Sequence, residues 1–520
     1  MRFSDVTPIL TAAILALAST ASPALADPPA DAKPVDPITT THETSIGGET
    51  ISYKATAGFM RLTNYEGKAR ANMFYTAYLR EGVADASKRP ILFAFNGGPG
   101  SSSVWLHMGT IGPKRIKMGP EGEPIGPPYE VVANAESWLD LADLVFIDPI
   151  STGFSRAAEG EDPKQFHGLD EDAAAVGDFI RLFTTKNNRW LSPKFLCGES
   201  YGTTRASALA SLLQDQHGMY LNGIILVSPV LNFQTIRFAS GNDTPFWLYL
   251  PTYTATAWYH KKLGTDLQKD LDKALARSEA FARSEYLEAL AMGDALKGDA
   301  REKVIKELAA LTGLSPSFIR KTNLRPDINE FTKELLRERD DKSGAQRGRT
   351  VGRLDSRYIG IDRDDAGASF EYDPSMSAIM GPYTAAINDY VRSELKFESD
   401  LPYEILTGRV HPWSFGGGNE YPNVSERLRG AMSRNRNLRV FVASGVYDLA
   451  TPHFAAQHTF DTMGLDPELS KNVTIKRYRG GHMMYVRDED RAGLKRDVAA
   501  FVSEALSTPL PTSVTLPAKP

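Results

Sequence analysis

The chain has 520 residues, 42% of them hydrophobic, and a formal net charge of −5. That length is enough for one large core with an inserted lobe, and the charge offers no basic stripe for nucleic acid. The single cysteine, Cys197, excludes an internal disulfide. No HExxH motif or paired-histidine spacing is present, so we predict neither a metal site nor a cofactor.

The N-terminus, residues 1–26, has the pattern of a secretory signal peptide. Arg2 precedes an apolar run at residues 9–18, and Ala24-Leu25-Ala26 forms an A-x-A cleavage site. The run is too short to span a bilayer, and no later segment is long enough, so we expect no membrane anchor. The short basic start predicts bacterial export, with a periplasmic or secreted product.

The fold class predicted for the globular part is α/β. Residues 27–43, rich in Pro, Asp, Ala and Thr, are expected to be a disordered linker before a core that begins with residues 44–232. Antiparallel strands are predicted near 50–57 and 72–79, and helices at 170–183 and 203–214. Uninterrupted apolar runs predict strands covered on both faces, at 91–95, 144–147, 195–197, 224–227 and 440–443. The pattern indicates a mixed, mostly parallel sheet flanked by helices.

A glycine-rich segment, residues 96–103 (NGGPGSSS), follows the apolar run at 90–95. It lacks the GK[ST] ending and the spacing of a phosphate-binding loop. Backbone N–H groups in such a loop are well suited to stabilise an oxyanion when a nucleophilic serine lies nearby.

A candidate nucleophile, Ser200, lies in the segment Gly198-Glu199-Ser200-Tyr201-Gly202. A short apolar run precedes this segment and a helix-compatible stretch follows it, which is the strand–turn–helix order of a nucleophile elbow. The two glycines suit a tight turn that leaves no room for a Cβ. The following helix directs its free N–H groups toward developing negative charge.

About 180 residues separate the runs at 224–227 and 440–443, with helical patterns at 267–291, 301–312 and 328–337. A structureless connection of that length is implausible, so we predict a mainly helical cap over residues 233–420. The core would resume over 421–507, and a disordered tail would occupy 508–520. Aromatic residues at the start of the cap are expected mostly to pack in its core, with some lining a side-chain pocket: Phe246, Trp247, Tyr249, Tyr253, Trp258 and Tyr259.

A serine hydroxyl needs a histidine base and an orienting carboxylate, and in α/β hydrolases these follow the serine in the order carboxylate, then histidine. Asp448 lies just past the buried run near 440–443, and His482 follows an alternating run at 473–478 through Gly480-Gly481. Both positions are loops after strands, where open α/β sheets carry their functional groups. The joint occurrence in the right order favours a catalytic triad over two unrelated loop residues.

With these segments in place, the chain resembles the serine carboxypeptidases, a family of the α/β-hydrolase superfamily. NGGPGxSS together with GESY is far more specific than either motif alone. The matching segments occur in family order: 96–103 (NGGPGSSS), 148–155 (DPISTGFS), 198–202 (GESYG), 445–448 (GVYD) and 480–483 (GGHM). The resemblance implies an α/β-hydrolase fold with a large helical cap.

The resemblance also implies roles for individual residues. Ser200 would be the nucleophile, His482 the general base and Asp448 its orienting carboxylate. The backbone amides of Gly98 and Tyr201 would form the oxyanion hole. The expected partner is a peptide with a free C-terminus, and the oligomeric state stays open.

By the same resemblance, Asn96 and Glu199 would hold the substrate's terminal carboxylate. Two carboxylates approach only when they share a proton, so Glu199 must be protonated and the peptidase is expected to favour acid. The chain departs from the family pattern where Ala94 replaces a tryptophan and Ser101 a cysteine. Thr110 stands where a second carboxylate-binding glutamate is common.

Three functions follow, in decreasing order of preference. The first is a serine-type carboxypeptidase that releases C-terminal amino acids. The second is an esterase, amidase or acyltransferase with the same triad, which the thinner carboxylate site leaves open. The third is an inactive hydrolase-fold binding protein, which an intact triad disfavours.

Overall fold

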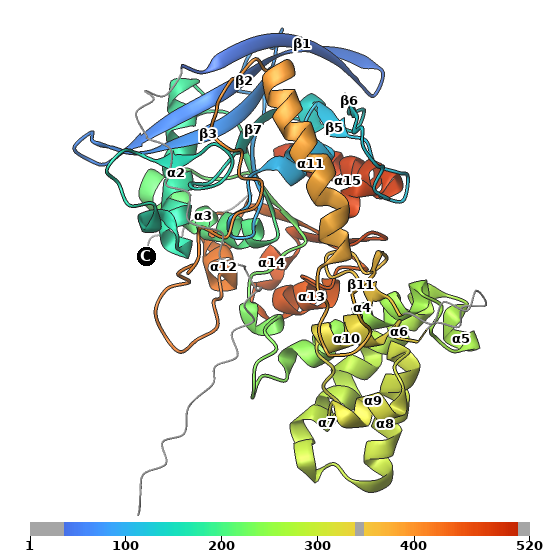
Figure 1. Cartoon of the computed structure of the whole chain (residues 1–520). Coiled ribbons are helices and arrows are strands. Elements are labelled where there is room, and N and C mark those ends of the chain that lie inside the picture. The colour runs from blue at the N-terminus through green and yellow to red at the C-terminus, as the bar shows by residue number, and fades with distance from the viewer. Residues whose placement is uncertain (1–35, 339–347, 508–520) are drawn as a thin grey trace, which may run out of the picture. The chain divides into compact units, whose positions relative to one another are not determined.

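The computed structural model of the chain, shown in Figure 1, describes residues 36–338 and 348–507. At its centre is a ten-stranded sheet in the order β1-β2-β3-β7-β4-β9-β10-β13-β14, with β8 paired to β3. The strands of this sheet are β1 (Ile38–Ile46), β2 (Glu49–Thr63), β3 (Ala69–Arg80), β4 (Ile91–Phe95), β7 (Asp143–Ile147), β8 (Arg156–Ala157), β9 (Lys194–Glu199), β10 (Gly223–Val227), β13 (Arg439–Gly445) and β14 (Val473–Tyr478). Two small antiparallel pairs lie outside it, β5 (Lys114–Ile116) with β6 (Val131–Ala133) and β11 (Thr350–Val351) with β12 (Ile359–Gly360).

The direction of pairing changes across the sheet. Strand β2 is antiparallel to both of its neighbours, β1 and β3, and β3 is antiparallel to β7. From β7 through β4, β9, β10 and β13 to β14, every neighbouring pair is parallel. The prediction of a mixed, mostly parallel sheet is confirmed.

Helices cover both faces of the sheet, which explains why its central strands are apolar throughout. In β4, Leu92 and Ala94 pack on the face covered by α11 and α15, whereas Ile91, Phe93 and Phe95 pack on the face covered by α2 and α3. The helices before β10 and after residue 373 are α1 (Val104–Leu106), α2 (Leu169–Lys186), α3 (Tyr201–His217), α11 (Pro374–Ser393), α12 (Ser425–Arg434), α13 (His453–Thr462), α14 (Pro467–Ser470) and α15 (Asp488–Ser507).

The segment between β10 and α11 folds into helices with a separate apolar cluster. These helices are α4 (Thr244–Tyr259), α5 (Thr265–Gln268), α6 (Leu271–Phe281), α7 (Leu287–Met292), α8 (Gly298–Thr312), α9 (Pro316–Lys321) and α10 (Ile328–Glu334). The aromatic start of the predicted cap is α4, where Trp247, Tyr249 and Tyr253 are buried. By contrast α11, within the same predicted cap, packs on the central sheet, so the bounds 233–420 stay a prediction.

The predicted linker was wrong in its last six residues. Residues 38–43 belong to β1, which pairs with β2 along its whole length. The threonines of this strand suit an edge position, and its alternation of exposed and half-buried residues gave a weak apolar signal. Residues 27–35, the predicted signal peptide and the predicted tail lie outside the described residues. Of the helices that the structure describes, none combines the length and hydropathy needed to cross a membrane.

Candidate active site

Ser200 occupies a sharp turn between β9 and α3. Its backbone has φ 59° and ψ −129°, a conformation that is costly for a residue with a side chain. A Cβ on Gly198 would come 2.2 Å from the Gly202 carbonyl oxygen, so a larger residue there would prevent the turn. The elbow predicted from the sequence is therefore present, with the serine half-buried at its tip.

The glycine-rich loop lies directly against this elbow. A Cβ on Gly97 would come 2.4 Å from the backbone nitrogen of Tyr201. Tyr201 is the first residue of α3, so its N–H has no acceptor within the helix. Gly98 has φ +101°, a conformation that favours glycine. The fold thus brings together the two segments that carry the predicted oxyanion-hole amides of Gly98 and Tyr201.

The segment 148–155 supports the glycine-rich loop through hydrogen bonds between Asp148 and Ser103. The backbone N–H and hydroxyl of Ser103 donate to Asp148 Oδ1 at 2.8 and 2.7 Å. Burial raises the pKa of Asp148 to about 6, although the bonds from Ser103 oppose the shift. A Cβ on Gly153 would fall 1.9 Å from Asp148 Oδ2, so this motif also depends on a glycine for close packing.

Asp448 and His482 form a buried pair after β13 and β14. Asp448 Oδ2 lies 2.8 Å from His482 Nδ1, and Asp448 also accepts hydrogen bonds from the N–H groups of Ala450 and Thr451 and from the Thr451 hydroxyl. Burial by itself lowers the pKa of His482, but the negative charges of Asp448 and Glu199 outweigh it, so this pKa is raised. The aspartate is therefore placed to orient the imidazole and to stabilise its cation.

The elbow and the histidine loop are joined through the residues that follow β10. The N–H of Ser200 donates to Val227 O at 3.0 Å, and the hydroxyl of Ser228 donates to His482 O at 2.6 Å. Within residues 36–338 and 348–507, the Ser200 hydroxyl itself makes no hydrogen bond. The structure thus brings the serine and histidine loops together at one edge of the sheet, while the bond between the two side chains is not formed. Such bonds are often loose before substrate binds.

Glu199 and Asn96 lie buried beside the elbow. The Tyr485 hydroxyl donates to Glu199 Oε2 at 2.5 Å. Burial raises the pKa of Glu199 to about 7, against the opposing effects of His482 and Tyr485. Asn96 Oδ1 accepts from Leu106 N–H at 3.1 Å, which fixes the amide. The Asn96 Nδ2 group lies close enough to Glu199 to favour its charged form, but not in the geometry of a hydrogen bond. Within the described residues, this Nδ2 is therefore a buried donor without a partner.

The comparisons with known proteins agree with this arrangement. The sequence profile of the family described as serine carboxypeptidase matches residues 47–495. The chain belongs to the serine carboxypeptidase family. Its mixed sheet with helices on both faces and an inserted helical region is the α/β-hydrolase fold, as predicted.

Two related carboxypeptidases are each less than 30% identical to this chain. It is 25% identical over 276 residues to serine carboxypeptidase-like 50 of Arabidopsis thaliana, an alignment that covers 52% of this chain and 56% of that protein. It is 28% identical over 212 residues to the pheromone-processing carboxypeptidase kex1 of Neosartorya fischeri, covering 39% of this chain and 30% of that one. The chain therefore matches only about half, or less, of the length of these relatives.

One solved serine carboxypeptidase shares the fold over most of its length. The crystal structure of Kex1(Δ)p, a prohormone-processing carboxypeptidase from Saccharomyces cerevisiae, superposes with a TM-score of 0.53 at 16% identity. The superposition covers 87% of this chain and 92% of that one.

A segment with no recognisable motif supports the backbone at His482. We call residues 353–358 the strap. The N–H of His482 donates to Leu354 O at 2.6 Å, and the N–H of Gly481 donates to Asp355 Oδ2 at 3.0 Å. The strap comes from the predicted cap, far from His482 in sequence, so its role depends on long-range contacts.

The strap also holds the loop of Asp448. The N–H of Leu449 donates to Arg353 O at 3.1 Å, and the N–H of Ser356 donates to Tyr447 O at 3.0 Å. The strap thus makes hydrogen bonds with the residues on either side of Asp448 and with the backbone at Gly481 and His482. It fixes the relative position of the two loops that carry the Asp448–His482 pair.

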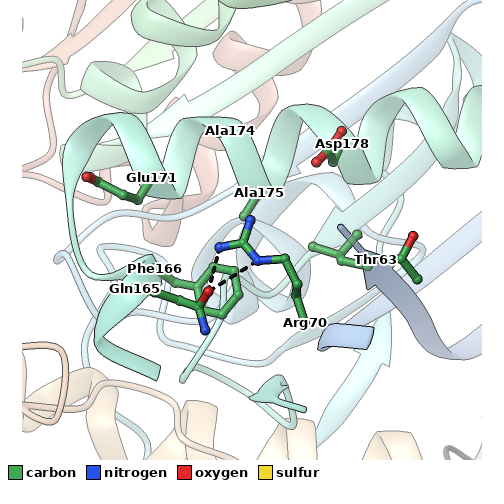
Figure 2. Close-up of a pocket in the computed structure, with 9 residues that line it drawn as sticks. Thr63, Arg70, Gln165, Phe166, Glu171, Ala174, Ala175 and Asp178 are labelled. Atoms are coloured by element: carbon green, nitrogen blue, oxygen red, sulfur yellow. Dashed lines mark hydrogen bonds between the residues drawn. The ribbon is translucent and has the colours of Figure 1, made fainter. Parts of the chain in front are cut away.

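A separate cavity of about 160 Å³ lies beside β2, β3 and α2, and none of the predicted site residues lines it. Figure 2 shows the Arg70 guanidinium directed at Gln165, whose Oε1 accepts from it at 2.6 and 3.2 Å. The cavity is lined by Leu62, Thr63, Arg70, Gln165, Phe166, Glu171, Ala174, Ala175 and Asp178. Across the described ranges, no group of three or more His, Cys, Asp or Glu residues is arranged to hold a metal ion.

Proposed function

We propose that the chain is a serine-type carboxypeptidase that releases C-terminal amino acids from peptides and works best in acid. The observation that carries the proposal is the buried pair formed by Asp448 and His482, joined by backbone contacts to the elbow of Ser200. Family membership over residues 47–495 supports the same reaction class.

In the proposed reaction, His482 Nε2 takes the proton of Ser200 Oγ as that oxygen attacks the scissile carbonyl carbon. The amides of Gly98 and Tyr201 stabilise the resulting oxyanion. His482 then gives the proton to the leaving amine, and the C–N bond breaks to leave an acyl-enzyme. Water, deprotonated by His482, then attacks the ester carbonyl carbon. The C–O bond to Ser200 breaks, the serine oxygen takes the proton back from His482, and the shortened peptide leaves with a new terminal carboxylate. Asp448 stabilises the imidazolium in both halves of the reaction.

Asn96 and Glu199 would bind the terminal carboxylate of the peptide. Asn96 Nδ2 is a fixed, buried donor with no protein partner among the described residues, which leaves it available to an incoming anion. Protonated Glu199 would add a second donor. Because the pKa of Glu199 is raised to about 7, a protonated side chain is accessible at mildly acidic pH.

The alternative is an esterase, amidase or acyltransferase that uses the same triad. It is favoured by Thr110, which stands where family members often have a second carboxylate-binding glutamate; its Oγ1 is buried and, in the described residues, without a partner. An inactive binding protein is the weakest candidate, because Ser200, Asp448 and His482 are all present.

The deciding experiment compares three substrates with the same acyl group: a blocked dipeptide with a free C-terminus, its amide and a simple ester. A carboxypeptidase cleaves the free acid best in mild acid, whereas equal or better cleavage of the amide and ester at all pH values would support the alternative. We also propose that a bacterial cell exports the protein and removes residues 1–26 in the process. N-terminal sequencing of protein recovered from the medium or periplasm tests that.

A further inference from the structure

Tyr485 is the residue that completes the surroundings of Glu199. It lies three residues after His482, in the short helix η7 (Met484–Val486), and is fully buried. Its hydroxyl donates to Glu199 Oε2 at 2.5 Å. In the described residues no other side chain makes a hydrogen bond of normal geometry to this carboxylate, and Oε1 has no partner.

The chain makes room for the Tyr485 ring at Gly109. A Cβ on this glycine would come 2.5 Å from Tyr485 Cε2 and 2.7 Å from the Tyr383 hydroxyl. The next residue on the same turn is Thr110, whose side chain has a hydroxyl and no carboxylate. The tyrosine ring thus packs against the residue just before Thr110.

Tyr485 can act on Glu199 only as a donor over the working pH range. Burial, together with the charge of Glu199, holds the pKa of Tyr485 well above its usual value, so the phenol keeps its proton. A donor that points at a carboxylate stabilises the charged form and lowers its pKa. Tyr485 thus opposes burial, which favours the neutral acid.

We propose that Tyr485 is a positioning residue for the carboxylate-binding site: it holds Glu199 by Oε2, leaves Oε1 and Asn96 Nδ2 for the terminal carboxylate of the peptide, and confines recognition of that carboxylate to acid. This inference rests on the proposed carboxypeptidase function and deepens it. The substrate class is a peptide with a free C-terminus.

The other titratable groups around Glu199 cannot be removed to change its pKa in the same selective way. His482 and Asp448 face it from the loops after β14 and β13, and both are assigned to the chemistry. Tyr383 of α11 and Cys197 of β9 interact with its charge but make no hydrogen bond to it in the described part of the chain. Tyr485 is the group whose removal changes Glu199 while leaving the triad intact.

The test is Tyr485→Phe, which keeps the ring against Gly109 and removes only the donor. For a free-acid peptide, the alkaline fall of kcat/KM should move upward by about one pH unit, because the pKa of Glu199 rises when a bond to its charged form is lost. For the amidated peptide, the profile should move much less and in the opposite direction, because it depends on Glu199 only through the effect of that charge on the pKa of His482. The same shift should appear when binding of the free-acid peptide is measured by calorimetry in the Ser200→Ala background.

A matched control is Tyr478→Phe. Tyr478 is also buried, ends β14 and donates to a carboxylate, Asp497 Oδ2, at 3.0 Å, but it lies outside the proposed site. Its loss should leave both profiles unchanged. A 3-fluorotyrosine at position 485 keeps the bond and strengthens the donor, so it should move the free-acid profile toward lower pH.

The outcomes separate this inference from the function on which it rests. If the wild-type enzyme does not distinguish free-acid from amidated peptides, the carboxypeptidase proposal fails. If it does distinguish them but Tyr485→Phe leaves the free-acid profile in place, or moves both profiles equally, Tyr485 only fills space. Should Tyr485→Phe not fold, the fluorotyrosine variant decides, since an unmoved profile there overturns the proposal.

Discussion

Gly481 and Asp355 are packed so closely that a Cβ on the glycine would come 2.5 Å from the Cβ of the aspartate. The Asp355 carboxylate accepts the Gly481 N–H and is itself gripped by Arg357, with Nε at 3.0 Å from Oδ1 and one terminal nitrogen at 2.7 Å from Oδ2. All three residues are buried. The strap thereby fixes the backbone that leads into His482.

Although Asp355 is not expected to contact the substrate, removal of its side chain should slow catalysis, because it positions the backbone before His482. Asp355→Ala leaves Arg357 with a weakened partner set, so we expect a stability loss of about 3 kcal/mol. We also expect kcat to fall by roughly 10- to 100-fold with little change in KM, because a displaced histidine is misaligned. Denaturant unfolding and steady-state kinetics check both effects. Asp355→Asn keeps an acceptor for Gly481 and should retain most of kcat; equal loss in both variants would argue against positioning through this bond.

The glycine-rich loop makes a steric prediction. Gly97→Ala should lower kcat/KM by about 100-fold or more, because its Cβ would push the loop away from Tyr201 N and open the oxyanion hole. Gly126→Ala is the control, since nothing lies within 4 Å of a Cβ there. Peptide and ester hydrolysis should both suffer in the first variant and neither in the second. Activity close to wild type in Gly97→Ala would show that the oxyanion is held elsewhere.

The nucleophile is tested by Ser200→Ala. Turnover should fall by about 10⁴-fold or more, with little change in the unfolding midpoint, because alanine keeps the Cβ at this strained position. Ser207→Ala is the matched control on α3, where the serine hydroxyl only bonds to Thr203 O. A fluorophosphonate probe should label the wild-type and Ser207→Ala proteins but not Ser200→Ala. Labelling of all three would assign the reactive serine to another position.

The elements that were predictable from sequence are those whose signals are local. Strand β4 reads as an unbroken apolar run because helices cover both of its faces, and the elbow at Ser200 needs glycines at fixed offsets. Strand β1 was not predicted, because its edge position requires few buried side chains and so leaves a weak apolar pattern. The predicted helix at 267–291 is divided in two places: α5 ends at Gln268 before α6 begins at Leu271, and the π-helical turn η5 (Ala282–Tyr286) separates α6 from α7. The apolar spacing does not mark these breaks.

The residues of the site also divide into those with a local sequence signal and those without one. Ser200, Asp448 and His482 stand at strand ends in a recognisable order, so topology alone places them at one edge of the sheet. Tyr485 and the strap have no local pattern. Their roles arise from contacts between segments more than 100 residues apart, such as Gly481 with Asp355, whose positions are 126 apart. Such contacts were beyond prediction from spacing.

Glu199 should make the protein less stable as pH rises. Its folded pKa, about 7, lies above the 4.5 of an ordinary glutamate, so stability is full below pH 4.5 and is lost as pH rises through 7. The loss is on the order of 3 kcal/mol. Glu199→Gln does not titrate, so its stability relative to wild type should increase between pH 4.5 and 7 and then level off. Urea unfolding at pH 4.5, 6 and 8 measures this, with the exposed Glu66→Gln as a control that should show no such trend.

The last prediction concerns the shape of the pH profile for a free-acid peptide. The productive state needs Glu199 protonated and His482 neutral, whereas its competitor has Glu199 charged and His482 cationic. Both states hold one proton between the two groups, so their ratio does not change with pH and the pair titrates as a unit. In more acidic solution His482 is charged and cannot accept the Ser200 proton. In more alkaline solution Glu199 loses the proton with which it binds the carboxylate.

The free-acid profile of kcat/KM should accordingly be bell-shaped, with limbs that belong to the pair. An amidated peptide needs only neutral His482, so its profile should rise once, through a pKa above the 6.5 of an ordinary histidine, and then stay level. In Glu199→Gln the alkaline limb for the free acid should disappear, because the amide donates at every pH. A free-acid profile that stays level into alkaline solution in the wild-type enzyme would mean that Glu199 takes no part in binding the carboxylate, and the esterase or acyltransferase alternative would then be preferred.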